Sequence, residues 1–196
     1  MLRDAMVGIF NLSAAVRAEM RGVSWHDHPA CPSFDSLRLL KLRHWGFDAA
    51  THATHEGELV VHVTLAAEVL TIFEQIYAAH FPIQHMRRID HYAGSDPESM
   101  AANNCSAFNF RVVEGTERLS HHALGQAIDI NPIQNPWLRG ERVDPEAGNA
   151  YLDRSLVRPG MITRPGPVVA AFEAAGWTWG GDATSPDYHH FSKHRE

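Results

Sequence analysis

The chain has 196 residues, of which 44% are hydrophobic, and its formal net charge is −6. A chain of this length corresponds to about one domain and can bury a core without disulfides or a metal. With 17 Lys and Arg against 23 Asp and Glu, it has no basic stripe for a phosphate backbone, so nucleic acid is not expected as a partner. No apolar run approaches the roughly 18 residues that span a bilayer, so no transmembrane segment is expected.

The cysteines and the N-terminal segment bear on location only weakly. Cys31 and Cys105 lack C-x-x-C spacing, so they predict neither a zinc ribbon nor a redox pair, and their pairing stays open. The apolar stretch in residues 1–20 is interrupted by polar residues such as Asp4 and Arg17. This pattern favours a helix over an export signal.

The chain contains no internal repeat or low-complexity tract. We interpret it as an N-terminal extension, residues 1–36, followed by one domain, residues 37–196. The β-rich residues 57–63 predict a strand. Apolar residues at i, i+3, i+4 and i+7 then predict a helix over residues 65–80, with Thr64 as its N-cap.

The second half is expected to hold short strands, one helix and two loops. Residues 94–104 form a polar loop, and residues 131–167, with six prolines and four glycines, form a long turn-rich loop. Residues 168–175 predict a helix with Gly176 at its C-terminal cap. Strands are expected over residues 83–89, 108–113, 126–130, 177–179 and 189–192. This irregular order predicts an α+β fold, with a small antiparallel sheet and flanking helices.

Residues 119–130, LSHHALGQAIDI, are the most informative stretch. His122 and Asp129 stand seven residues apart, and strand alternation turns Asp129 away from the core-facing isoleucines. Gly125 permits a tight turn, so His122 can fold back over the acid. Imidazole and carboxylate are both zinc ligands. A buried pair with a purely structural role is the alternative.

A second stretch near the C-terminus has the sequence DYHHF and places Asp187 three residues before His190. A catalytic zinc site uses three protein ligands and leaves one position to water. One histidine here would complete the set, and Asp187 could accept the proton of the water that the metal activates. A chance pattern in an exposed loop is the alternative.

Together the two motifs resemble the zinc D-alanyl-D-alanine carboxypeptidase family. Its relatives include the dipeptidases of vancomycin resistance and the L-alanyl-D-glutamate peptidases of phage endolysins. The pattern Ser-x-His-x-x-Gly-x-Ala-x-Asp at residues 120–129 is matched in full, and Asp-x-x-His-Phe follows at residues 187–191. The segments HWGFD, GELVVH, SAFNFR and DINP extend the resemblance over residues 37–193. The family has a small α+β fold shared with the hedgehog signalling module.

The resemblance implies that a catalytic Zn²⁺ is bound by His122, Asp129 and His190. It also implies that Asp187 is the catalytic base. His190 is a better ligand than His189 because it directly precedes Phe191 and lies three residues after the acid, as in the family pattern.

Further roles are implied for the substrate side of the site. Ser120 would help to bind a carboxylate or carbonyl of the substrate, and Ser106 is also assigned to substrate binding. Arg111 would stabilise the oxyanion of the tetrahedral intermediate, as a cation is expected to do. Arg87 and Arg88 are its rivals for this role.

The remaining histidines and two late tryptophans are given structural roles. His121 is expected to line the cleft, whereas Trp177 and Trp179 are expected to pack in the core or cleft wall. Surface or capping roles are expected for His26, His28, His44, His52, His55, His62, His80, His85 and His91.

The implied activity is hydrolysis of peptidoglycan stem peptides, with removal of terminal D-Ala as the leading reaction. An endopeptidase that cuts L-Ala–D-Glu or a cross-link is one alternative, and an inactive, zinc-stabilised binding module of the hedgehog type is another. The presence of Asp187 favours an enzyme. The substrate suggests a location in the cell wall or outside the cell, although a cytoplasmic location stays open because no clear export signal is found. The oligomeric state is not indicated.

Overall fold

The computed structural model describes residues 7–48 and 53–193. The strands are β1 (Gly8–Phe10), β2 (Leu37–Trp45), β3 (Thr54–His62), β4 (His85–Met86), β5 (Asn104–Cys105), β6 (Ala127–Asp129), β7 (Trp137–Arg139), β8 (Arg142–Asp144), β9 (Thr178–Trp179) and β10 (His190–Ser192). The α-helices are α1 (Ala14–Met20), α2 (Ala66–Ala78), α3 (Asp96–Ala101) and α4 (Pro167–Ala174). Short 3₁₀ helices are η1 (Phe34–Ser36), η2 (Ile89–Tyr92), η3 (His121–Leu124), η4 (Glu146–Tyr151) and η5 (Gly180–Asp182).

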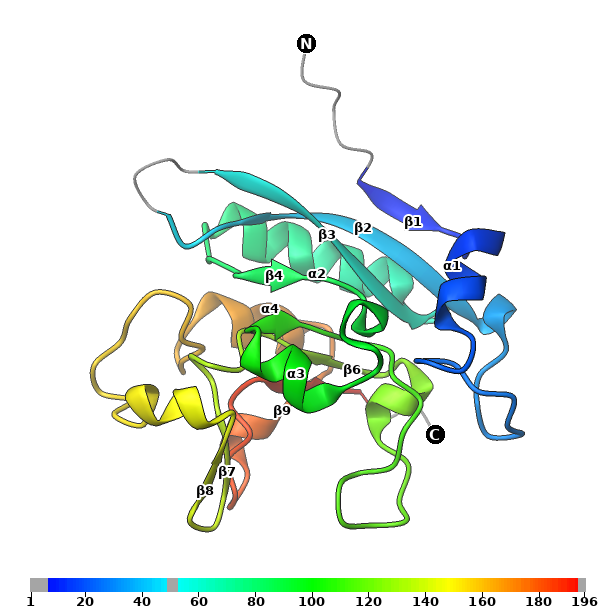
Figure 1. The fold of residues 1–196 in the computed structure, drawn as a ribbon. Coiled ribbons are helices and arrows are strands. Elements are labelled where there is room, and N and C mark those ends of the chain that lie inside the picture. The colour runs from blue at the N-terminus through cyan, green and yellow to red at the C-terminus, as the bar shows by residue number, and fades with distance from the viewer. Residues whose placement is uncertain (1–6, 49–52, 194–196) are drawn as a thin grey trace.

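Two small antiparallel sheets form the frame of the molecule (Figure 1). In the first sheet, β2 lies between β1 and β3, and β2 pairs with β3 along its whole length. In the second sheet, β10 lies between β6 and β9. The short pairs β4–β5, which is parallel, and β7–β8 complete the strands. The predicted α+β class agrees with this arrangement, while the likeness to the hedgehog module stays a prediction.

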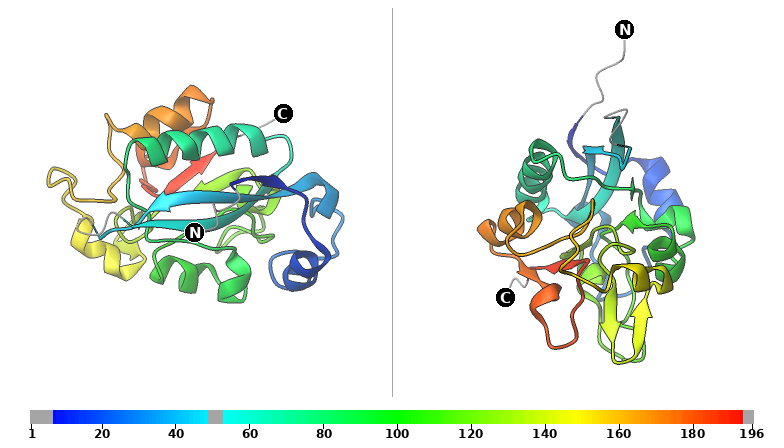
Figure 2. Two further views of the ribbon diagram at one scale, coloured as in Figure 1. Left: turned by 90° about the horizontal axis from the view of Figure 1, so that it is seen from above. Right: turned by 90° about the vertical axis from the view of Figure 1, so that its left-hand side faces the viewer.

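The main core lies between these sheets and the helices α2 and α4, which pack side by side (Figure 2). Phe172 of α4 stacks on Phe191 of β10 with ring centroids 4.0 Å apart, and Phe73 of α2 meets Phe172 edge-on. Because side chains alternate along a strand, burying Phe191 turns the neighbouring His190 to the opposite face. Ile128 in β6 is buried in the same core and does the same for Asp129.

Several predicted elements are confirmed with shifted ends. The helix expected over residues 65–80 is α2, but its N-cap is Leu65 and not Thr64. The Thr64 hydroxyl instead lies 2.8 Å from Nδ1 of His62, so it closes a local turn and leaves the helix uncapped by a side chain. The strand expected over residues 57–63 is β3 and begins earlier, because its pairing with β2 continues to Thr54.

The late elements also match. The helix expected over residues 168–175 is α4, and Gly176 follows it with φ 78°, as a C-terminal glycine should. Trp177 and Trp179 are buried in the core, as predicted. The strands expected over residues 126–130, 177–179 and 189–192 are confirmed as β6, β9 and β10.

The loop expected over residues 94–104 is a wrong prediction, because it contains the helix α3. Ser95 caps the helix by accepting a hydrogen bond from the N–H of Glu98 at 3.3 Å. Pro97 stands in the first turn, where its missing N–H costs nothing. The Ser-x-x-Glu spacing and this proline were available signals for a helix start.

Other predicted elements are shorter or differently paired. Residues 83–89 contain only the two-residue strand β4 and the start of η2, and residues 108–113 form no ladder beyond a single bridge between Val112 and Leu119. The long loop over residues 131–167 carries the β7–β8 hairpin and η4. It is therefore more ordered than its prolines and glycines suggested.

The described part of the predicted N-terminal extension packs on the first sheet. β1 pairs with β2, and Met20 of α1 lies in a second apolar cluster with Leu37 and Phe108. Residues 1–6 of the expected N-terminal helix lie outside the described part of the chain, and of its described residues only 14–20 are helical. Among the described helices, none has the length and apolar composition needed to cross a bilayer.

The structure describes both cysteines and all but one of the scattered histidines. Cys31 and Cys105 are free and lie in different apolar clusters. His44 corrects the surface assignment, because it is buried with Nδ1 3.0 Å from the carbonyl of Ile83. His52 lies outside the described residues.

Gly125 yields a stability prediction. It has φ 66°, and a Cβ there would lie 2.7 Å from the backbone nitrogen of His62. Gly115 has φ 76° but open space around it, so it is a matched control. In urea unfolding, Gly115→Ala should lower the unfolding free energy by about 1 kcal/mol, and Gly125→Ala by about 3 kcal/mol because backbone must also move. Equal losses would show that the close approach to β3 is unimportant.

Candidate active site

The pairing of β6 with β10 brings two polar side chains together across a sheet. Asp129 is the direct partner of His190 in this register. Both side chains face away from the core, and Asp129 Oδ1 lies 3.0 Å from His190 Nδ1. Residues 61 positions apart in sequence are thus brought into contact by the pairing of two strands.

His122 reaches the same point from η3. Ser120 caps this turn by accepting a hydrogen bond from the N–H of His122 at 3.2 Å, and Gly125 ends it in a left-handed conformation. The ring places Nε2 3.1 Å from Asp129 Oδ2 and 3.3 Å from His190 Nδ1. The tight turn predicted at Gly125 therefore does fold His122 back over the acid.

A backbone carbonyl group on the far side of the ring fixes the tautomer of His122. Its Nδ1 lies 2.6 Å from the carbonyl oxygen of Ala107, which only accepts, so Nδ1 carries the hydrogen and donates. When the ring is neutral, the lone pair of Nε2 therefore faces Asp129 and His190. A metal-ligating histidine commonly has this kind of backbone partner on its other ring nitrogen.

Ligand atoms of His122, Asp129 and His190 all lie within 4.8 Å of one another. This is the one group of at least three potential ligands that the described residues form. Two imidazoles and one carboxylate suit zinc, and three protein ligands leave a coordination position for water or substrate. The donor set therefore fits the catalytic type of zinc site.

The electrostatics of the centre favour a charged Asp129. Burial alone would raise the pKa of this carboxyl group, but the charges of His122 and His189 and hydrogen bonds from the histidines hold it well below its usual value. Burial opposes charge on His122, yet Asp129 outweighs it and raises the pKa of the imidazole. Since ligand nitrogens must be unprotonated, protons should compete with a metal here.

Asp187 lies beside the three ligands, on the segment that leads into β10. Burial raises the pKa of its carboxyl group. Its Oδ1 is 3.0 Å from His189 Nε2, although these atoms are not aligned for a hydrogen bond. A carboxyl group with one buried oxygen that lacks a hydrogen-bond partner is suited to exchange a proton.

His189 lies behind the ligands and not among them. Its Nδ1 donates to the carbonyl of Asn135 at 2.8 Å, and its Nε2 stays 3.9 Å from Asp129 Oδ1. The side chain of Asn135 in turn bonds the backbone of Ile130, Asn131, Gly160 and Ile162. This arrangement supports the choice of His190 over His189 and ties the long loop to the site.

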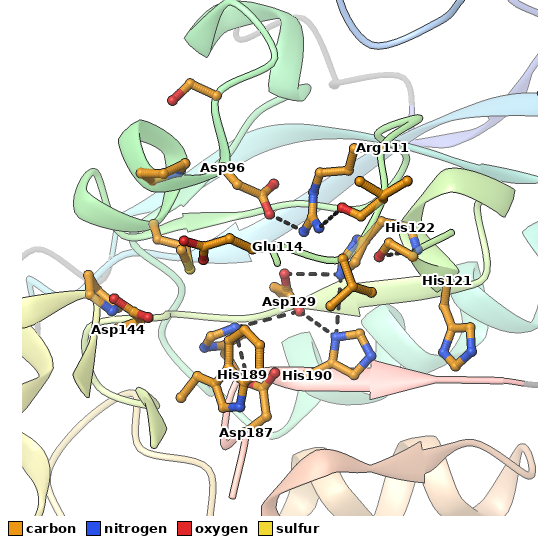
Figure 3. Close-up of a pocket in the computed structure, with 18 of the residues that line it drawn as sticks. Asp96, Arg111, Glu114, His121, His122, Asp129, Asp144, Asp187, His189 and His190 are labelled. Carbon is orange, nitrogen blue, oxygen red and sulfur yellow. Dashed lines mark hydrogen bonds and ion pairs between the residues drawn. The ribbon is translucent and has the colours of Figure 1, made fainter. Parts of the chain in front are cut away.

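A cavity of about 810 Å³ opens over these residues (Figure 3). Arg111, Ser120 and His121 line it together with the three ligands and Asp187. The structure thus brings together almost all of the residues that the motifs single out. His121 was expected to line the cleft. The centroid of its ring lies 6.4 Å from that of the His190 ring.

Arg111 is better placed for a role in the cavity than its two rivals. Neither Arg87 nor Arg88 lines it, and Arg88 is buried in ion pairs with acidic groups, among them Glu58 at 3.3 Å. Arg111 forms an ion pair with Asp96, the first residue of α3. Asp96 was missed by the sequence analysis because its helix was taken for a loop.

Ser106 is placed differently from Ser120. It is buried, does not line the cavity, and exchanges two backbone hydrogen bonds with Asp129, at 3.1 and 2.9 Å. The structure therefore supports a scaffold role for Ser106 in holding Asp129. Ser120 lines the cavity, and its hydroxyl can still donate while it caps η3.

The comparisons with known proteins agree with the motifs. Residues 114–193 match the model of the family described as D-alanyl-D-alanine carboxypeptidase. This match confirms the family resemblance over residues 114–193, which include all three potential ligands and Asp187, and it does not cover the segments before residue 114. No curated protein and no solved structure gave a significant match.

The ligand set yields a prediction about metal content. His122→Ala and Asp129→Ala should each remove most of the zinc from a protein that otherwise holds about one ion per chain, because three ligands leave little redundancy. His121→Ala is the matched control, since this histidine lines the cavity outside the ligand group. Elemental analysis of the purified variants measures the effect. Full zinc content in His122→Ala or Asp129→Ala would contradict the ligand set.

Proposed function

We propose that this protein is a zinc peptidase that acts on peptidoglycan stem peptides and removes their terminal D-alanine. The observation that carries the proposal is the convergence of His122, Asp129 and His190 in an open cavity with Asp187 beside them. The family match over the same segment supports a peptidase. Such a substrate would place the protein in the cell wall or outside the cell.

The three ligands would hold zinc, which supplies Lewis acidity for activating water and polarising the scissile carbonyl group. Asp187 would accept the proton from the attacking water and pass it to the leaving amine. Its raised pKa suits this exchange, because a general base works best when its pKa lies near the working pH.

Arg111 would stabilise the negative charge that develops on the carbonyl oxygen. Its guanidinium is held by Asp96 and donates to the carbonyl of Val112 at 3.3 Å, so its position is set before substrate binds. Donors fixed in advance lose little energy to reorganisation during the reaction. Ser120, on the same cavity wall, would orient the substrate.

Two other functions compete with this one. An endopeptidase would use the same centre on a longer peptide, and an inactive zinc-stabilised module would keep the ligands without a base. The carboxyl group of Asp187, which lines the cavity beside the ligands, favours an enzyme over the module. Mass spectrometry of products from purified muropeptides distinguishes all three outcomes, because loss of one D-alanine, internal cleavage and no cleavage differ in mass.

Replacing Asp187 tests the base. Asp187→Asn keeps the size of the side chain but cannot accept a proton, so zinc should stay bound while kcat on a muropeptide falls by about 100- to 10,000-fold. Asp182→Asn is the control, because Asp182 lies outside the cavity and pairs with Arg164. Steady-state kinetics and elemental analysis are measured together. Wild-type turnover in Asp187→Asn would remove this residue from the mechanism.

Replacing Arg111 tests the oxyanion role. Arg111→Ala should lower kcat by about 100-fold or more, with zinc content unchanged, because one oxyanion donor contributes on that scale. Arg87→Ala is the matched control, since Arg87 is exposed and does not line the cavity. A rise in KM with constant kcat would instead assign Arg111 to substrate binding.

A further inference from the structure

The cavity is bounded by two hairpins that come from different parts of the chain. The first is the turn over residues 112–119, closed by the Val112–Leu119 bridge, and the second is the β7–β8 hairpin. Both project from the same side of the molecule (Figure 1). Residues of both line the cavity, so they form two of its walls.

The first hairpin is bonded to the segment that carries the ligand His122, and the second hairpin is bonded to the segment that carries Asp187. The first hairpin continues into the ligand segment, where the N–H of Ser120 bonds the carbonyl of Arg111 at 3.1 Å. The second hairpin is joined to the base, because Trp137 pairs with Asp187 and the N–H of Leu138 bonds the carbonyl of Pro186 at 2.8 Å. A contact between the hairpins therefore spans the catalytic centre.

Such a contact exists. Glu114 on the first hairpin lies 2.6 Å from Arg139 and 3.5 Å from Arg142 on the second. Both arginines also contact Asp144, at 3.1 and 2.8 Å. Figure 3 shows Glu114 lying between Arg111 on one wall and Asp144 on the other. We call Glu114, Arg139, Arg142 and Asp144 the cleft bridge.

The cleft bridge has a fixed side and a releasable side. Asp144 is nearly buried, with a side chain 11% exposed, and Arg139 stacks over the Trp137 ring at 4.4 Å. Glu114 is 64% exposed. Exposed ion pairs contribute little to stability and are screened by salt, so the Glu114 contacts can break while Arg139 and Asp144 stay in place.

The bridge limits what can lie in the cleft. A peptide that passes between the two hairpins has to displace Glu114, whereas a peptide that ends there does not. In an uncross-linked stem peptide the leaving group is a single amino acid, but in a cross-linked peptide it is a second peptide strand. A single amino acid would not need to pass the closed bridge, whereas a second strand lying between the hairpins would require it to open.

We propose that the cleft bridge is a specificity determinant that makes this site select uncross-linked stem peptides over cross-linked ones. The inference rests on the proposed function and names its substrate class. Glu114 is the residue that controls the selection, because it alone supplies the first hairpin's side of the bridge among the described residues.

The test compares zinc-loaded wild-type protein with Glu114→Gln and Glu117→Gln. Glu117 is a matched control, because it lies in the same exposed turn and no ion pair of it is found within the described chain. The substrates are a monomeric pentapeptide muropeptide and a cross-linked dimer. Hydrogen exchange of residues 112–119 and 137–144 is measured on the same samples, so the contact is followed independently of activity.

The ratio of kcat/KM on the dimer to that on the monomer should rise by about two- to fivefold in Glu114→Gln, the range expected for an exposed ion pair. High salt should raise this ratio in the wild type but not in Glu114→Gln, because screening breaks the same contact. Exchange should speed up in both hairpins of Glu114→Gln only.

Three results would overturn the inference. Equal ratios in the three proteins would show that Glu114 does not select substrates. Unchanged exchange in Glu114→Gln would show that it does not join the hairpins. If exchange speeds up in Glu114→Gln but the wild-type protein cleaves neither muropeptide, the contact between the hairpins is upheld, while the proposed function and the substrate selection are overturned.

Discussion

The candidate catalytic centre depends on the antiparallel pairing of β6 with β10. These strands are three residues long each, yet their register sets Asp129 against His190 on one face and Ile128 against Phe191 on the other. The apolar pair lies in the main core, and a shift of one residue would move the polar side chains into it. The hydrophobic packing of one face thus specifies the geometry of the other.

The centre concentrates charge where the fold would otherwise exclude it. His122 and Asp129 are almost fully buried, and a buried charge is costly unless it is paired and hydrogen-bonded. Backbone groups meet part of that need, because Ala107 accepts from His122 and Ser106 pairs with Asp129. A bound cation would satisfy the remaining lone pairs, which is consistent with a centre whose stability is coupled to metal binding.

The sequence predicted which residues meet in the centre better than it predicted the residues around them, and the reason is physical. His122 and Asp129 are linked by a local turn at Gly125, and the late motif has its own fixed spacing, so short patterns carry this information. The partner of Arg111 could not be found in this way, because Asp96 lies 15 positions earlier on a helix mistaken for a loop. The Glu114 contacts depend on how two hairpins meet, which no local pattern encodes.

The Asn135 contacts described above suggest where the length of this chain can vary. Asn135 joins the strand end at Ile130 to the loop backbone at Gly160 and Ile162, and its carbonyl holds His189. An insertion between residues 131 and 135 would break contacts beneath the ligands. The hairpin tips at Gly115 and Gly140 have open space around them and do not support the ligands. Relatives should therefore differ in length at the two rims of the cavity, where new loops would reshape substrate choice, and keep the floor unchanged.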